Sequence, residues 1–278
     1  NILLPPLPQL QTMSRPGSEE AAQLFEGALG VEWKACLDRY QAAVACVAEK
    51  KRKPELVQLD NFLWGDLVRT AGDRKPVHIT HEELAGVMKW KLARGKARPL
   101  QKLVESNSPS AVEEASAKAL ALVSKGKWEA AVGAITVLKG IGPATATAVL
   151  APFAPALVPF MADEVMEATG CQRDYTLPVY KIVRSALLAK AGELGPDWTA
   201  EGVGKALWVR AMMELFPQIL RAKAPTSLPT TGAEVESKGD KKGAKEAKGE
   251  SGGSMRSVGS VQVELEEPAP SSKRKAGR

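Results

Sequence analysis

The chain has 278 residues, of which 44% are hydrophobic and only 5% aromatic, so a core has to be built mainly from Ala, Leu and Val. Lysine and arginine number 38 against 32 acidic residues, and the formal net charge of +6 favours polyanionic partners such as nucleic acid. The 3 cysteines and 2 histidines are too few and too scattered for a disulfide framework, a structural zinc or an iron–sulfur cluster. No apolar run approaches the roughly 18 residues of a membrane span. We therefore expect no metal, no cofactor and no membrane association.

Changes in composition divide the chain into three parts. Residues 1–20 are rich in proline and lack a sustained periodicity, so we expect a disordered lead-in. Residues 21–222 carry apolar residues at helical spacing and should form one domain. Residues 223–278 are rich in Lys, Gly, Glu and Ser with almost no large apolar side chain, which predicts a disordered basic tail.

Periodic apolar residues predict helices from the start of the central part. We expect one or two helices over 20–50 and another over 55–70, in which Asp60 should be an N-cap or a charge on the helix face. The second of these regions has apolar residues at steps of three or four, the pattern of a single buried stripe: Leu56, Leu59, Leu63, Leu67 and Val68.

The helix that follows has a defined start. Thr80 and Glu83 have the spacing of a capping box, in which each side chain bonds the backbone of the other residue. This helix should run to Gly95, and shorter helices should follow over 99–106, 110–125 and 128–138. No segment alternates with a period of two, so the sequence predicts an all-α domain.

The most informative stretch joins two of these helices, at about 128–150. A helix running to Leu138 is followed by Gly140-Ile141-Gly142, and Pro143 stands where the first turn of a second helix begins. Glycine permits the backbone angles of a tight turn and lets another backbone approach closely. The free amides at the start of the second helix, with its dipole, predict a phosphate-binding site. The alternative is a plain helix-ending turn within a bundle.

This stretch resembles the helix-hairpin-helix motif, although Lys139 stands where that motif often has Pro. A Pro-rich loop then leads to Asp163, which is the order found in the helix-hairpin-helix DNA glycosylase superfamily. The resemblance is close over about 30 residues and weak over the rest of the helical domain, and it implies an all-α glycosylase-like fold. The residues that match the motif are Leu138, Gly140, Ile141, Gly142 and Ala146.

The resemblance also implies roles for individual residues. Asp163 matches the catalytic aspartate, which stabilises the positive charge that develops on the sugar after the base has been flipped out of the duplex. Glu164 is a weaker candidate, and Asp163 is equally suited to be the N-cap of a helix. The residues implied to bind DNA phosphates are Gly140, Ile141, Gly142 and Ala144.

Ala144 also limits the chemistry that the resemblance implies. Lyase-active members of the superfamily have a lysine at this position, 19 residues before Asp163 in this chain. Alanine has no amine and forms no Schiff base. If the chain is an enzyme, the resemblance therefore implies a monofunctional N-glycosylase of base excision repair.

A basic segment lies between the capping box and the hairpin. Five of the ten residues from 89 to 98 are cationic and none is acidic, which exceeds what compensation of the helix dipole requires. We therefore expect a surface that faces DNA or another anion, formed by Lys89, Lys91, Arg94, Lys96 and Arg98. His78 and His81, near the start of the same helix, are expected to be exposed to solvent.

The remaining expectations concern location and partners. The cluster Lys273, Arg274 and Lys275 is typical of a nuclear address. We expect a monomeric nuclear protein that binds double-stranded DNA, with base excision as one hypothesis. A non-catalytic DNA-binding module and an α-helical interaction module are the alternatives.

Overall fold

The computed structural model describes residues 18–27 and 30–221. Residues 18–20 belong to the first helix, so the helical domain begins before the predicted residue 21. The rest of the expected lead-in, the expected tail and the basic cluster 273–275 lie outside the described residues. Within the described ranges every regular element is a helix, which confirms the predicted all-α class.

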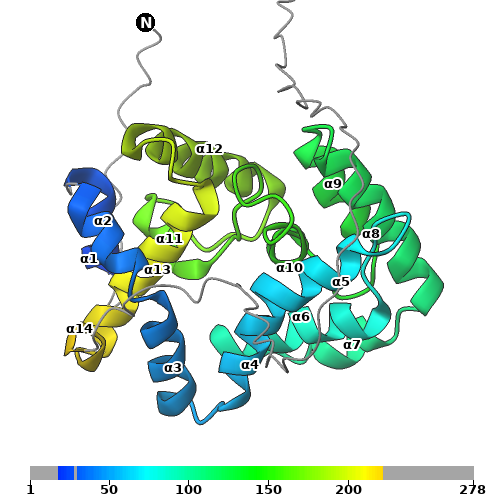
Figure 1. Ribbon diagram of the computed structural model, residues 1–278, viewed down its shortest axis with the longest axis horizontal. Coiled ribbons are helices and arrows are strands. Elements are labelled where there is room, and N and C mark those ends of the chain that lie inside the picture. The colour runs from blue at the N-terminus through cyan, green and yellow to red at the C-terminus, as the bar shows by residue number, and fades with distance from the viewer. Residues whose placement is uncertain (1–17, 28–29, 222–278) are drawn as a thin grey trace, which may run out of the picture. The chain divides into compact units, whose positions relative to one another are not determined.

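The helices follow one another with short connections (Figure 1). Three helices, rather than one or two, occupy the region 20–50. The elements in chain order are α1 (Ser18–Gly27), α2 (Gly30–Leu37), α3 (Tyr40–Lys50), α4 (Glu55–Asn61), the π-helical turn η1 (Phe62–Asp66), α5 (Leu67–Gly72), α6 (His81–Arg94), α7 (Gln101–Glu105), α8 (Pro109–Val123), α9 (Trp128–Ile135), α10 (Pro143–Leu150), α11 (Asp163–Ala168), α12 (Leu177–Leu194), α13 (Ala200–Leu215) and α14 (Gln218–Arg221).

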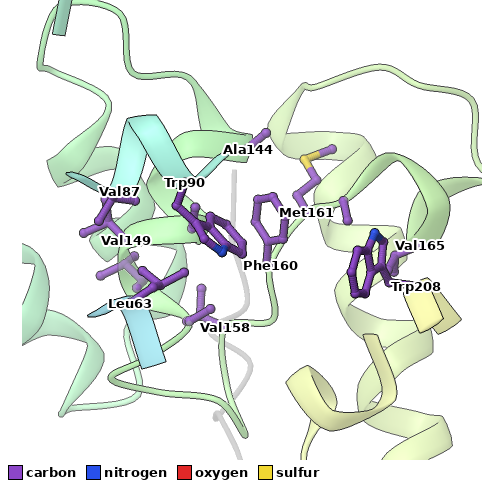
Figure 2. Close-up of a cluster of buried hydrophobic side chains, with 14 of the residues drawn as sticks. Leu63, Val87, Trp90, Ala144, Val149, Val158, Phe160, Met161, Val165 and Trp208 are labelled. Atoms are coloured by element: carbon purple, nitrogen blue, oxygen red, sulfur yellow. The ribbon is translucent and has the colours of Figure 1, made fainter. Parts of the chain in front are cut away.

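Two groups of helices build the domain. Helix α13 packs against α1, α2, α11 and α12, whereas α6 packs against α4, α7, α8 and α10, and α3 contacts both α13 and α6. Large aromatic side chains fill the space between these groups. Figure 2 shows Phe160 between Trp90 of α6 and Trp208 of α13, and the Trp90 and Phe160 ring centroids are 5.1 Å apart. The C-terminal end of α6 and the loop before α11 are therefore fixed by core packing.

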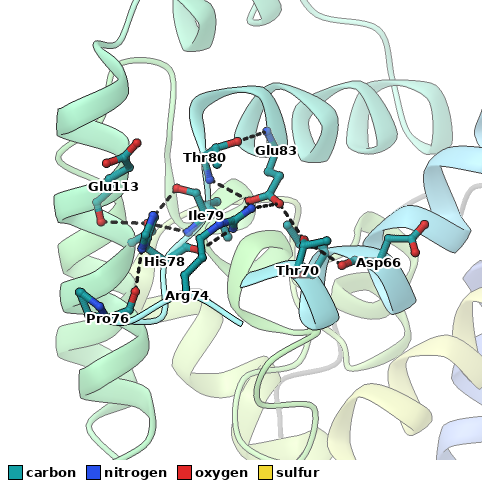
Figure 3. Close-up of polar contacts among 11 residues, drawn as sticks. Asp66, Thr70, Arg74, Pro76, His78, Ile79, Thr80, Glu83 and Glu113 are labelled. Atoms are coloured by element: carbon teal, nitrogen blue, oxygen red, sulfur yellow. Dashed lines mark hydrogen bonds and ion pairs between the residues drawn. The ribbon is translucent and has the colours of Figure 1, made fainter. Parts of the chain in front are cut away.

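The start of α6 has the predicted capping box. Thr80 Oγ1 accepts a hydrogen bond from Glu83 N, and the Glu83 carboxylate accepts one of 2.8 Å from Thr80 N. Arg74 and Thr70 also donate to this carboxylate, so Glu83 links α5 to α6 (Figure 3). Burial raises the pKa of Glu83, but the bonds from Arg74 and Thr80 outweigh it and the pKa is lowered.

The predicted helix over 55–70 contains a π-helical turn and continues to Gly72. A side chain at Gly86 would lie only 2.9 Å from the Phe62 ring, so the glycine lets this turn pack closely on α6. Asp60 corrects the sequence prediction, because it is completely buried and is neither an N-cap nor an exposed charge. Its Oδ1 accepts hydrogen bonds of 2.8 Å from Tyr40 Oη and 2.9 Å from Trp90 Nε1.

The two histidines are half-buried rather than exposed. A His78 ring nitrogen lies 2.7 Å from Pro76 O, and a His81 ring nitrogen lies 2.9 Å from Glu105 O. Over residues 18–27 and 30–221, the structure contains no group of His, Cys, Asp and Glu side chains arranged to hold a metal ion. In the same ranges no helix combines the length and the apolar character needed to cross a membrane.

Candidate nucleic-acid interface and cavity

The turn between α9 and α10 has a conformation that requires glycine. Helix α9 ends at Ile135, three residues before the predicted end, and residues 136–142 form the connection. Gly140 has a φ of +78°, and a side chain there would lie 3.1 Å from Val104 Cγ2. Both the left-handed backbone and the close approach of α7 therefore exclude larger residues at this position.

Asn107 holds this turn from outside. Its Oδ1 accepts a hydrogen bond of 2.8 Å from Lys139 N, and its Nδ2 donates to Lys139 O at 3.1 Å and to Val104 O at 2.7 Å. The sequence indicates only that the segment around Asn107 separates two helices. Its contact with a turn 32 residues away depends on the tertiary fold.

The start of α10 is open toward solvent. Gly142 is its N-cap, in an extended conformation without a side-chain cap, and Pro143 follows as the first helical residue. A side chain at Gly142 would meet no atom within 4 Å. Ile141 and Ala144, by contrast, are buried, at 6% and 5% exposure. The turn is therefore anchored by its apolar residues and presents backbone at Gly142.

The turn borders a cavity of about 680 Å³, and residues from three separate sequence predictions line this cavity. All four predicted phosphate-binding residues line it, together with Asp163 and four of the five predicted basic residues. Lys89 is the exception, because it is exposed on α6 and does not line this cavity. The cationic residues of the wall are Lys51, Lys91, Arg94, Lys96, Arg98 and Arg173, and the acidic ones are Asp163, Glu164 and Glu167.

Two neighbouring side chains bond the carboxylate of Asp163. It is the first residue of α11 and Ala162 is the N-cap, so the N-cap interpretation of Asp163 is wrong. Its Oδ1 accepts a hydrogen bond of 2.7 Å from Tyr175 Oη, and its Oδ2 lies 2.9 Å from Arg173 Nη1. Burial and the bond to Asp163 raise the pKa of Tyr175, so the phenol remains a donor. Arg173 also bonds Glu167 at 3.0 Å.

Arg94 also lines the cavity and is only 8% exposed. Its guanidinium carbon lies 4.3 Å from the centroid of Trp208, 5.3 Å from that of Phe160 and 5.4 Å from that of Trp90. Its Nε is buried and has no hydrogen-bond partner. Lys51, which sequence reasoning missed, donates to the carbonyl oxygens of Arg94 and Gly95 and so caps the C-terminal end of α6.

Two buried carboxylates support the aromatic residues around Arg94. Asp60 bonds Trp90, as described above, and Glu201 Oε2 accepts a hydrogen bond of 2.7 Å from Phe160 N. Burial raises the pKa of Glu201 above its ordinary value, and the opposing effect of nearby Lys205 is smaller. Both carboxylates bond neutral donors, and among the described residues neither forms an ion pair with Arg94.

Most of the remaining wall is apolar, and the sequence assigned none of its large side chains to the site. These apolar side chains come from the loop before α11, from the C-terminal part of α13 and from the residue that follows α13. No motif marks these residues, because their side chains are ordinary core types. They are Phe160, Met161, Met212, Leu215 and Phe216.

Comparison with known proteins gives no assignment. No family model matches the chain, and neither a curated protein nor a solved structure matches it significantly. The helix-hairpin-helix relationship therefore stays a prediction, carried by the residues of the hairpin, the loop and Asp163.

Proposed function

We propose that this protein binds double-stranded DNA through the turn at residues 138–144 and accommodates one everted nucleotide in the adjoining cavity. The observation that carries the proposal is that the turn, the basic segment and Asp163 line the same cavity. An open helix start flanked by cations suits a phosphate of the DNA backbone. The cavity volume lies within the range of small-molecule sites.

In the catalytic form of the proposal, the protein hydrolyses the N-glycosidic bond of the everted nucleotide. Water adds to the anomeric carbon of the sugar, the glycosidic bond breaks, and the base leaves with a proton. The carboxylate of Asp163 opposes the positive charge that builds on the sugar. Ala144 supplies no amine, so the expected product is an intact abasic site, cleaved only after alkali or heat.

A borohydride-trapping assay checks this last point. We expect no covalent adduct with DNA. The cavity wall contains Lys51, Lys91 and Lys96, so an adduct that disappears in any one of the three Lys→Met variants would replace the monofunctional assignment by a lyase.

A matched pair of variants at Gly142 tests DNA binding. The position faces open space, so Gly142→Asp and Gly142→Asn should both fold. Aspartate places a negative charge at the proposed phosphate site and should weaken duplex binding about tenfold at low salt. It should also reduce the slope of log affinity against log salt by about one, whereas asparagine of the same shape should have a much smaller effect. Equal affinities for the two variants would contradict the phosphate site.

A non-catalytic DNA-binding module is the alternative that one observation favours. Arg173 lies 2.9 Å from Asp163 and offsets the charge that catalysis would use. A panel of duplexes with single damaged bases separates the two forms, because only the enzyme releases a free base. A folded protein without salt-dependent DNA affinity would instead indicate a helical interaction module.

A further inference from the structure

Arg94 is a fixed donor group that the protein itself does not use. It is 8% exposed, lines the cavity and has a buried Nε without a hydrogen-bond partner. Among the residues that the structure describes, no carboxylate forms an ion pair with it. Because Nε is fully buried, a ligand in the cavity would bond the terminal Nη groups, which are not among the buried unpartnered atoms and for which the described residues supply no acceptor. These Nη groups are the donors to which a ligand can supply acceptors.

The surroundings of Arg94 restrict the geometry of that acceptor. Aromatic rings of Trp208, Phe160 and Trp90 lie 4.3–5.4 Å from the guanidinium carbon and keep the group in place. The planar guanidinium directs its donors within its own plane and matches two acceptors side by side. The ligand should therefore present two adjacent acceptors along one edge.

The remaining wall favours a flat, uncharged ring over a phosphate group. The cavity wall carries the carboxylates Asp163, Glu164 and Glu167 as well as cations, so charge alone does not select a phosphate. A phosphate would leave the apolar side chains of Phe160 and Met212 facing water. A bicyclic base covers these side chains and brings no net charge near the carboxylates.

We propose that Arg94 binds the O6 and N7 atoms of a 6-oxopurine, such as hypoxanthine, xanthine or guanine, in this cavity. These two atoms are adjacent acceptors on one edge, the pattern that arginine binds with two parallel hydrogen bonds. Adenine has an amino group in place of O6, which would set donor against donor. For DNA, this assignment rests on the proposed function and specifies the class of base that the cavity accepts.

Binding of free bases tests the assignment without DNA. Calorimetric titration of the full chain with hypoxanthine, adenine and 7-deazahypoxanthine should show hypoxanthine binding about ten- to a hundredfold more tightly than either of the others. The deaza base lacks only the N7 acceptor, so this comparison needs no protein variant. Equal affinities for hypoxanthine and its deaza analogue would overturn the proposal.

Variants then assign the preference to Arg94. Arg94→Lys keeps the charge but removes the paired donors, and it should abolish the preference for hypoxanthine over adenine. Arg69→Lys, an exposed change outside the cavity wall, should leave the preference intact. An Arg94→Lys protein that folds and keeps the full preference would contradict the role of Arg94. Binding of inorganic phosphate that disappears in Arg94→Lys, without any binding of hypoxanthine, would show an anion site instead.

Duplex DNA links the two proposals and separates their failures. A duplex with one hypoxanthine should bind more tightly than its adenine counterpart, and the difference should vanish in Arg94→Lys. If free hypoxanthine binds through Arg94 but the chain has no affinity for duplex DNA, the base site stands and the DNA function fails. If DNA binding responds to Gly142→Asp while Arg94→Lys changes no base preference, the DNA function stands and the base site fails.

Discussion

Arg94 and Asp163 line the same cavity, but their charged groups differ in whether protein groups already bond them. Arg94 is enclosed by aromatic rings and has no bonded partner on Nε. Asp163 is bonded on one oxygen by Tyr175 and on the other by Arg173. The first is a donor left for a ligand, whereas the second is an acceptor already in use.

This difference bears on which of the two residues can bind a ligand and which can act in catalysis. A ligand can bond Arg94 without displacing any protein group, because the guanidinium is fixed by packing. Asp163 can face a charge on a substrate only where its bonds to Arg173 and Tyr175 leave a lone pair free. Binding of a base in the cavity should therefore depend mainly on Arg94, and base release should depend mainly on Asp163.

The largest expected effect is on chemistry. Asp163→Asn keeps the shape of the side chain but removes its negative charge, so base release should fall about a hundred- to a thousandfold. Duplex affinity should change less than twofold, since Asp163 is not part of the turn that we propose to bind phosphate. Single-turnover assays with damaged duplexes measure the rate, and filter binding measures the affinity. If wild type and variant are equally inactive on every lesion while both bind DNA, the binding-module alternative gains support.

A smaller effect is expected on the stability of the folded protein, through the buried carboxylate of Asp60 near Arg94. Asp60→Asn leaves Tyr40 and Trp90 with a weaker acceptor and removes a buried negative charge near Arg94 and Lys205. We expect a loss of about 2–4 kcal/mol in the free energy of unfolding, measured by urea denaturation. Asp66→Asn is the control, because Asp66 is exposed and its ion pair with Arg69 contributes about 0.5 kcal/mol or less. Equal losses in the two variants would contradict a special role for the buried carboxylate.

The smallest effect concerns the pH dependence of stability. Burial and the neighbouring Arg98 lower the pKa of Lys91 from 10.5, although Asp163 opposes them. Since the folded pKa lies below the unfolded one, the unfolded chain binds more protons between the two values, and stability should rise with pH in that range. Lys91→Met should reduce this rise below pH 10.5 in thermal melts, whereas Lys89→Met, an exposed change on the same helix, should not.

Local patterns predicted much of the candidate site. The capping box at Thr80, the glycine turn and the basic segment depend on neighbours in sequence, and the structure contains all three. Asp163 was found by its position after the hairpin, although Ala162 rather than Asp163 caps α11. These features are visible because residue type and spacing determine them.

The parts that sequence reasoning missed depend on contacts between distant helices. Lys51 reaches the end of α6 across 43 residues, and Asp60 is buried because the aromatic core closes around it. Arg94 was predicted as one cation among five on a surface. Its burial depends on Trp208, more than 100 residues later, which no local pattern indicates.

Hydrogen exchange of the full chain, with and without a hypoxanthine-containing duplex, tests most directly whether the turn and the cavity form one nucleic-acid site. The amides of Gly140, Gly142 and residues 96–98 lie outside helices and donate no hydrogen bond within the described residues, so they should exchange quickly in the free protein. We expect the duplex to slow exchange in both segments, while the loop at 195–198, which is not part of this cavity, stays unchanged. Protection confined to other regions, or none at 138–142 under conditions where the duplex is bound, would contradict the proposed interface.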